Sequence, residues 1–260
     1  MGSLLLLGTG ASCGSPVIGC SCQVCTSNDP KNRRLRCSSL LKTHGKTILI
    51  DAGPDIRTQA LNYGIAKIDG LILTHTHYDH VGGLEELRIY NFMQEKPIDC
   101  LLSKESLSAV HKLFYYLFEP RATLTNFTSK FTFHPLSHDR GETTFCDIPI
   151  RYFSYHQSNM KVLGFRIADI AYVTDIKNYP ETIFEDLHGV STLVLSALRF
   201  GKSDIQFTID DAVDFANKVG AKMTYLIHMS HDIEYHHIAT LLPENIKPAY
   251  DGLELHFKDI

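Results

Sequence analysis

Short apolar runs that end in polar or glycine-containing turns recur along this chain and predict buried β-strands. Runs of four or five residues fit such strands, although periodicity alone does not exclude a short helical segment. A first strand is expected over residues 3–7, where four leucines follow one another. The other runs lie at residues 47–50, 70–73, 170–173, 192–195 and 223–227.

Helical patterns separate some of these runs. The clearest covers residues 209–219, which follow a candidate cap at Thr208 and end before Gly220. Strands interspersed with helices predict an α/β layered fold rather than a helix bundle. No repeat, low-complexity segment or long linker interrupts the pattern. A single domain over residues 1–260 is therefore the simplest organisation.

Histidine and aspartate residues follow the ends of several predicted strands. Ligands of open α/β sheets gather beyond the carboxyl ends of the strands, so residues far apart in the chain can meet at one edge. We expect this convergence for five residues, namely Asp51, His75, His77, Asp175 and His228.

Residues 75–80 read His-Thr-His-Tyr-Asp-His. If the preceding strand continues through His75 and His77, both side chains share a face and can reach one ion. Asp79 and His80 would then serve a second ion about 3.5–4 Å from the first. A lone histidine is more often a surface or core residue, but three histidines and an aspartate in six residues indicate a metal site. Zinc, manganese and iron all suit such ligands.

Composition places few limits on function. The 260 residues can form a sizeable core, and a net charge of -4 gives no general attraction to nucleic acid or anionic membranes. Bound divalent cations would nevertheless make the site itself positive. No apolar stretch approaches the roughly 20 residues that span a bilayer. The leucine run has no basic segment before it, so we expect a cytoplasmic protein without a membrane anchor.

Three cysteines, Cys20, Cys22 and Cys25, lie within six residues. A thiolate-rich cluster favours zinc, and one further ligand would complete a tetrahedral structural site. On spacing alone, unremarkable or redox-active thiols remain the alternative.

The run from His75 to His80 resembles the His-x-His-x-Asp-His signature of metallo-β-lactamase-fold hydrolases. The resemblance implies a four-layer αββα sandwich with two divalent metal ions, zinc or manganese or iron. It places His75, His77 and His156, which follows a predicted strand over residues 151–155, on one ion. The ligands that it implies for the other ion are Asp79, His80 and His228. Asp175 would bridge the two ions, and Asp51 would orient a ligand imidazole.

The cysteine cluster after Gly8-Thr9-Gly10, together with the histidine pair His228 and His231, narrows this resemblance. Both features resemble phosphoribosyl 1,2-cyclic phosphate phosphodiesterases, the PhnP-like subgroup. That subgroup implies a structural zinc held by Cys20, Cys22, Cys25 and His231. It also implies hydrolysis of a small cyclic phosphate or nucleotide-like substrate, with Asp79 and Asp175 as catalytic residues.

One residue departs from the subgroup. Gln206 stands where its relatives have a histidine near the scissile phosphate, and glutamine can donate a hydrogen bond but cannot shuttle a proton. Gln206 is a candidate substrate contact. Arg88 is a second, because its predicted helix begins at the metal ligands and arginine binds phosphate in a bidentate manner.

Two alternatives remain open. The first is an RNA-processing nuclease of the same fold, which is less favoured because the sequence shows no basic, glycine-rich arm for gripping RNA. The second belongs to another class, a non-catalytic protein that binds metal and ligand, which the replacement at Gln206 supports. A homodimer is compatible with either alternative.

Overall fold

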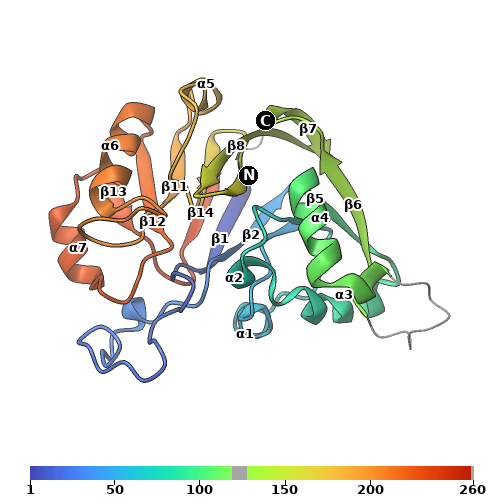
Figure 1. The fold of residues 1–260 in the computed structure, drawn as a ribbon, viewed down its shortest axis with the longest axis horizontal. Helices are drawn as coiled ribbons and strands as arrows, with labels where there is room; N and C mark the ends of the chain where they lie inside the picture. The colour runs from blue at the N-terminus through green and yellow to red at the C-terminus, as the bar shows by residue number, and fades with distance from the viewer. Residues whose placement is uncertain (119–127, 259–260) are drawn as a thin grey trace.

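The computed structural model describes residues 1–118 and 128–258. Two seven-stranded β-sheets pack face to face, and helices cover their outer faces (Figure 1). In spatial order, the first sheet contains β14 (Glu254–Phe257), β1 (Gly2–Gly8), β2 (Ser38–Thr43), β3 (Lys46–Ile50), β4 (Gly70–Ile72), β5 (Ile98–Ser103) and β6 (Phe131–Leu136). The second contains β13 (Ile246–Pro248), β12 (Met223–Ile227), β11 (Thr192–Ser196), β10 (Ile170–Val173), β9 (Met160–Ile167), β8 (Ile148–Gln157) and β7 (Arg140–Phe145).

The helices divide between the two outer faces. Those against the first sheet are α1 (Ile56–Asn62), α2 (Tyr78–Val81), α3 (Arg88–Gln94) and α4 (Lys104–Leu113). Those against the second sheet are α5 (Ile183–Asp186), α6 (Ile209–Val219) and α7 (Tyr235–Leu241). Short 3-10 turns occur at η1 (Pro30–Asn32), η2 (Leu84–Leu87) and η3 (Tyr115–Phe118). This arrangement is the four-layer αββα sandwich that the sequence resemblance implied.

Three hydrophobic cores hold the layers together, one between the sheets and one under each helical layer. Alternate residues of a strand face opposite sides of the sheet. In β3, Ile48 and Ile50 pack between the sheets, whereas Leu49 packs under the helices. Because strands of this kind are buried on both faces, they appear in the sequence as continuous apolar runs.

The predicted elements are present, although five of the seven predicted strands differ in extent by one or more residues. Helix α6 covers residues 209–219, and Thr208 and Asp211 form a reciprocal capping box at its start. Gly220 ends it in the left-handed conformation at φ 71°. Strand β4 ends one residue before its predicted end, while β8 continues two residues beyond the predicted end at Tyr155.

The edge where the two sheets end together carries three residues in the left-handed conformation. Asp51 directly follows β3, Asp175 lies two residues after β10, and His228 directly follows β12. Their φ values are 59°, 56° and 58°. This region costs an L-residue about 1–2 kcal/mol, and such backbone strain is concentrated at functional sites. None of the helices among the described residues is long and apolar enough to cross a membrane.

Candidate metal centres

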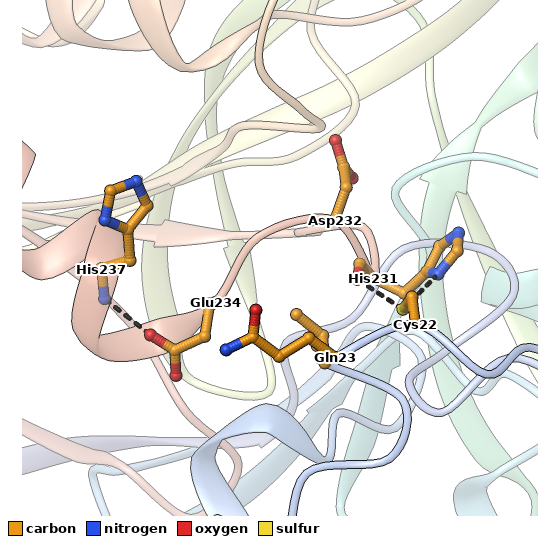
Figure 2. Close-up of a pocket in the computed structure, with 7 residues that line it drawn as sticks. Cys22, Gln23, His231, Asp232, Glu234 and His237 are labelled. Atoms are coloured by element: carbon orange, nitrogen blue, oxygen red, sulfur yellow. Dashed lines mark hydrogen bonds between the residues drawn. The ribbon is translucent and has the colours of Figure 1, made fainter.

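The cysteine loop between β1 and η1 closes on His231, which lies in the loop between β12 and α7 (Figure 2). The Sγ atoms of Cys20, Cys22 and Cys25 lie 3.4, 3.5 and 3.5 Å from His231 Nδ1. One imidazole nitrogen has a single lone pair, so it cannot accept a proton from all three thiols. Metal–ligand bonds of about 2.0–2.3 Å would instead place the ligand atoms of one zinc ion roughly 3.3–3.8 Å apart. The cluster therefore has the size and composition of a closed Cys₃His zinc site.

Electrostatics at Cys22 favour the form of the thiol that binds metal. The backbone N–H of Cys25 and the ring of His231 lower the pKa of the Cys22 thiol to about 6. The thiolate, rather than the thiol, is the metal ligand. Cys22 is thus ionised at neutral pH before any cation arrives.

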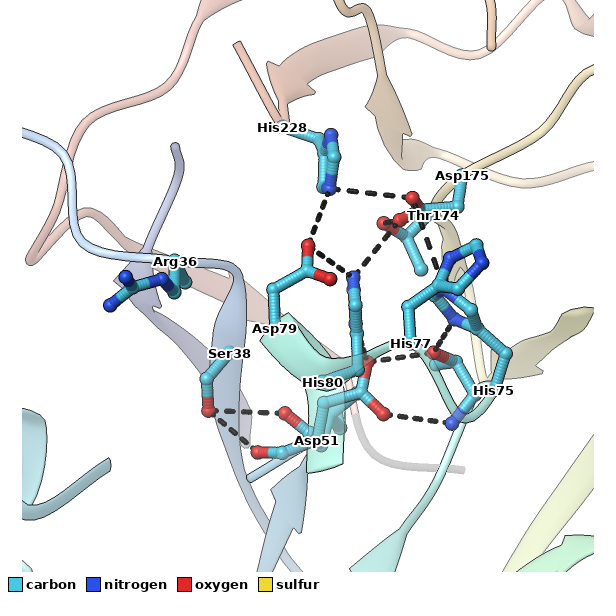
Figure 3. Close-up of polar contacts among 12 residues, drawn as sticks. Arg36, Ser38, Asp51, His75, His77, Asp79, His80, Thr174, Asp175 and His228 are labelled. Atoms are coloured by element: carbon cyan, nitrogen blue, oxygen red, sulfur yellow. Dashed lines mark hydrogen bonds and ion pairs between the residues drawn. The ribbon is translucent and has the colours of Figure 1, made fainter. Parts of the chain in front are cut away.

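The rings of His75 and His77 converge on one point, although neither residue lies within a strand (Figure 3). His75 Nε2 and His77 Nδ1 are 3.0 Å apart. The other nitrogen of His75, Nδ1, lies 3.0 Å from Thr74 Oγ1, which leaves Nε2 for a ligand. This pair can hold one cation between its two nitrogens.

A second group forms beside this pair from α2 and the loop after β12. Asp79 Oδ2 lies 3.5 Å from His80 Nε2 and 3.4 Å from His228 Nε2. Asp175 lies between the groups: its carboxylate is 3.3 Å from both of these Nε2 atoms and 3.9 Å from His75 Nε2. These separations exceed the usual 2.9–3.0 Å of an N–H···O bond. They match the spacing of atoms that share a cation.

The charges of this cluster fit divalent cations. Burial would raise the pKa values of Asp79 and Asp175, but the neighbouring histidines hold both well below the usual range. Burial lowers the pKa of His75, whereas Asp175 and Asp51 outweigh the same effect at His80 and raise its pKa well above normal. Buried carboxylates that stay ionised need compensating positive charge, and a metal ion supplies it.

Asp51 fixes the orientation of His80. Its Oδ2 lies 2.7 Å from His80 Nδ1, and the backbone N–H and hydroxyl of Thr74 donate to the same carboxylate at 2.8 and 2.7 Å. A carboxylate that accepts from one ring nitrogen sets the tautomer, so Nε2 is left free to bind metal. The His80 ring thus points its Nε2 atom toward the cluster because a buried carboxylate holds it from behind.

Comparison with known proteins agrees with this geometry. The family model of the β-lactamase superfamily domain matches residues 46–229, which include every residue of the His/Asp cluster. This chain belongs to that superfamily. It is a metallo-β-lactamase-fold, metal-dependent hydrolase, and the fold implies divalent metal ions such as zinc.

Two solved structures show which members of the superfamily this chain resembles. A crystal structure of a diphosphatase from the PhnP family is 34% identical, superposes with a TM-score of 0.90, and is matched over 98% of this chain and 97% of that chain. Zinc-bound PqqB from Methylobacterium extorquens is 16% identical and superposes with a TM-score of 0.77. The match covers 98% of this chain and 100% of the PqqB chain. The likeness to PqqB shows the fold alone. Membership of a PhnP-like group follows from the first of these matches.

A curated relative is longer than this chain. Octanoyltransferase from Porphyromonas gingivalis is 34% identical over 258 residues, which are 96% of this chain but 50% of that protein. The chain therefore spans about half the length of this relative.

The hydrolase fold does not bring His156 into the His/Asp cluster. Strand β8 continues through Gln157, so its pleat places His156 and Gln157 on opposite sides of the sheet. The side chain of His156 is exposed, whereas Gln157 is buried and lines the cleft with His77 and Asp175. Tyr152 packs between the two sheets, whereas Tyr155 packs under the helices of the second sheet, so His156 lies on the side of β8 that faces the first sheet. The assignment of His156 as the third ligand of the ion that His75 and His77 would share stays a prediction.

The two candidate substrate contacts lie in different places. Arg88 is exposed and lies 3.8 Å from Glu85, outside the cleft, because η2 separates its helix from α2. Arg199 lines the cleft instead. Gln206 is buried there, and its amide donates a hydrogen bond to Asp175 Oδ1. The glutamine therefore supports the carboxylate that joins the two metal groups.

The cleft has a volume of about 360 Å³ and includes residues that the sequence did not single out. Its further lining residues are Ser12, Tyr78, Gln157, Leu198 and Ile205.

Proposed function

We propose that this protein is a dinuclear metal-dependent phosphohydrolase that cleaves the phosphodiester or diphosphate linkage of a small, nucleotide-like substrate. The position of Asp175 carries the proposal. Its carboxylate lies 3.9 Å from His75 Nε2 on one side and 3.3 Å from His80 Nε2 and His228 Nε2 on the other. A carboxylate between two ligand groups is the arrangement that two adjacent cations require.

The residues of the cluster would have distinct roles. Divalent ions bound here would act as Lewis acids and lower the pKa of a water molecule toward neutrality. His75 and His77 would hold one ion and Asp79, His80 and His228 the other; zinc, manganese and iron all fit these ligands. A separate zinc at the Cys₃His site would have a structural role.

The protein's own side chains would position the substrate. Arg199 presents a guanidinium group to the cleft, where it can bind phosphate oxygens. Asp175, supported by Gln206, would orient the attacking water from the other side. The negatively charged phosphate would thus lie between Arg199 and the metal-binding residues.

The choice of a phosphate substrate is supported by the 34% identical diphosphatase, which this chain matches along its length. The name of the octanoyltransferase describes a protein of which this chain matches only half. It therefore gives no support for an acyl substrate of this chain. An RNA substrate is the competing possibility within the same chemistry. A cleft of about 360 Å³ favours a substrate with one or two nucleotide units.

The test is hydrolysis of bis-p-nitrophenyl phosphate by protein loaded with manganese or zinc. Asp79→Ala removes one ligand and should lower kcat/KM at least about 10²-fold. Asp214→Ala, which removes a carboxylate from the exposed face of α6, is the matched control and should leave turnover unchanged. Wild-type turnover in Asp79→Ala would refute the proposed mechanism. Cyclic mononucleotides, dinucleoside diphosphates and short RNAs then separate the substrate classes.

A second candidate function is metal-dependent binding without turnover. The side chain of Gln206 favours this function, because it contacts Asp175 and an amide cannot transfer a proton. Full metal occupancy with no hydrolysis of any phosphate ester in the same assay would support this alternative.

A further inference from the structure

Two exposed apolar side chains, one from each half of the sandwich, line the cleft beside the His/Asp cluster. Tyr78 is the first residue of α2 and is 71% exposed. Ile205 lies in the loop between β11 and α6 and is 51% exposed. Single apolar residues on a surface need no explanation, but these two share a cleft with the candidate metal ligands. They form a part of the cleft that a phosphate group does not use.

The position of the Tyr78 ring depends on Gly82, one turn further along the chain. A Cβ atom at Gly82 would lie 2.8 Å from the Cε2 and Cζ atoms of this ring. Glycine therefore leaves the space in which the ring rests against the helix. The neighbours of Tyr78 in the chain, His77 and Asp79, line the same cleft. The ring is thus placed beside the metal-binding groups and stays open to the cleft.

Backbone hydrogen bonds close the loop that carries Ile205. The N–H of Leu198 donates to the Phe207 carbonyl at 2.8 Å, which brings the two ends of the loop together. The N–H of Phe207 donates to the Ile176 carbonyl at 2.9 Å and ties the loop to the segment after β10. Arg199 and Ile205 lie between these ends, and both line the cleft. One loop thus supplies a cation and an apolar side chain to the same cleft.

This combination of groups suits a nucleotide better than a phosphorylated sugar without a base. The hydroxyl groups of a sugar need hydrogen-bond partners, whereas an aliphatic side chain and the face of an aromatic ring offer none. A nucleobase has a planar face that stacks on an aromatic side chain. A cleft of about 360 Å³ has room for one such unit beside the phosphate.

We propose that Tyr78 and Ile205 hold the nucleobase of the substrate, with the base stacked on the tyrosine ring and packed against the isoleucine. This inference rests on the proposed phosphohydrolase function and names the part of the substrate that the metal centre does not recognise. Every base has an aromatic face, so a stacking contact accepts purines and pyrimidines alike. Recognition should therefore require a base without selecting one.

Matched substrates with and without a base test the proposal. Metal-loaded, full-length protein is assayed with the p-nitrophenyl phosphodiester of thymidine and with the diester of the same sugar that lacks the base. Both release the same leaving group, so the ratio of their kcat/KM values measures the contribution of the base. In the wild type this ratio should favour the thymidine ester about tenfold or more, mainly through KM.

Substitutions at the two side chains should change this ratio. Tyr78→Ala should lower it about tenfold, Ile205→Ala should lower it less, and Tyr78→Phe should keep it because the aromatic ring remains. Tyr115→Ala and Leu241→Ala remove comparably exposed apolar side chains outside the cleft and should match the wild type. Both substrates are measured on the same sample, so partial loss of folded protein does not alter the ratio.

The outcomes separate this inference from the proposed function. Equal kcat/KM values for the two esters in the wild type, or a wild-type ratio in Tyr78→Ala, would overturn the base-binding assignment and leave the phosphohydrolase standing. Failure of the metal-loaded wild type to hydrolyse either ester would overturn both.

Discussion

Gln206 places a neutral amide against Asp175, which matters for the leaving group of the proposed reaction. Its Nε2 donates to Asp175 Oδ1, while its Oε1 has no partner within the described part of the chain. An amide does not ionise near neutral pH, so it can hold a carboxylate in place but cannot protonate an alkoxide. Departure of the leaving group then depends on its own acidity.

Restoring a histidine at this position should change leaving-group dependence. In Gln206→His we expect turnover of a nucleoside cyclic monophosphate, which releases a poor alkoxide leaving group, to rise by up to about 10²-fold. Bis-p-nitrophenyl phosphate, which releases an acidic phenol, should gain little. The ratio of the two kcat/KM values measures the effect, with Gln206→Leu as the control. Equal gains on both substrates would contradict the argument.

The loops after the strands connect the two metal centres. His228 and His231 lie three residues apart and belong to different clusters. One of the two intervening residues, Met229, is held by the N-terminal loop: its N–H donates to the carbonyl of Thr9 and its carbonyl accepts from the N–H of Ala11, both at 3.0 Å. The cysteine site therefore anchors the segment that also positions His228.

Removing one thiolate should show this connection. Cys22→Ser is expected to release one zinc per chain and to lower the melting temperature, because binding free energy at a structural site contributes to folding. Cys13→Ser, at an exposed cysteine outside the cluster, is the control and should keep both properties. Zinc content by mass spectrometry and thermal unfolding are the measurements. An unchanged zinc count in Cys22→Ser would disprove the Cys₃His assignment.

How far an element could be predicted from the sequence depended on what determines its ends. Helix α6 was predicted to the residue because its cap and its terminating glycine are local signals. The end of β8 depends on pairing with β9 and on bonds to Asn178, partners distant in the sequence pattern. Local sequence signals therefore could not set the end of this strand. Arg88 was misplaced for a similar reason, since the break at η2 is not encoded by any glycine or proline inside it.

For the molecule as a whole, the His/Asp cluster joins two separately covered sheets. His75, His77, Asp79 and His80 follow β4 of the first sheet, whereas Asp175 and His228 follow strands of the second. Ions bound here would contact both halves of the sandwich. They would also neutralise carboxylates that the fold buries in the ionised state.

Metal removal should consequently weaken the whole fold. A ligand that binds only the native state stabilises it by about 2.7 kcal/mol at a hundredfold excess over its Kd. We expect the unfolding temperature to rise with Mn²⁺ or Zn²⁺ concentration and to fall in excess chelator. Asp79→Ala should reduce this dependence, and Asp214→Ala should preserve it. Differential scanning calorimetry across a metal titration is the measurement; a melting temperature independent of metal would count against a bound native ion.

The left-handed backbone at Asp51, Asp175 and His228 has an evolutionary consequence. Glycine adopts this conformation without the steric cost that aspartate and histidine incur. Mutation under selection for folding alone would therefore drift toward glycine at all three positions. A lineage that had lost its metal chemistry should therefore show glycine at these positions early.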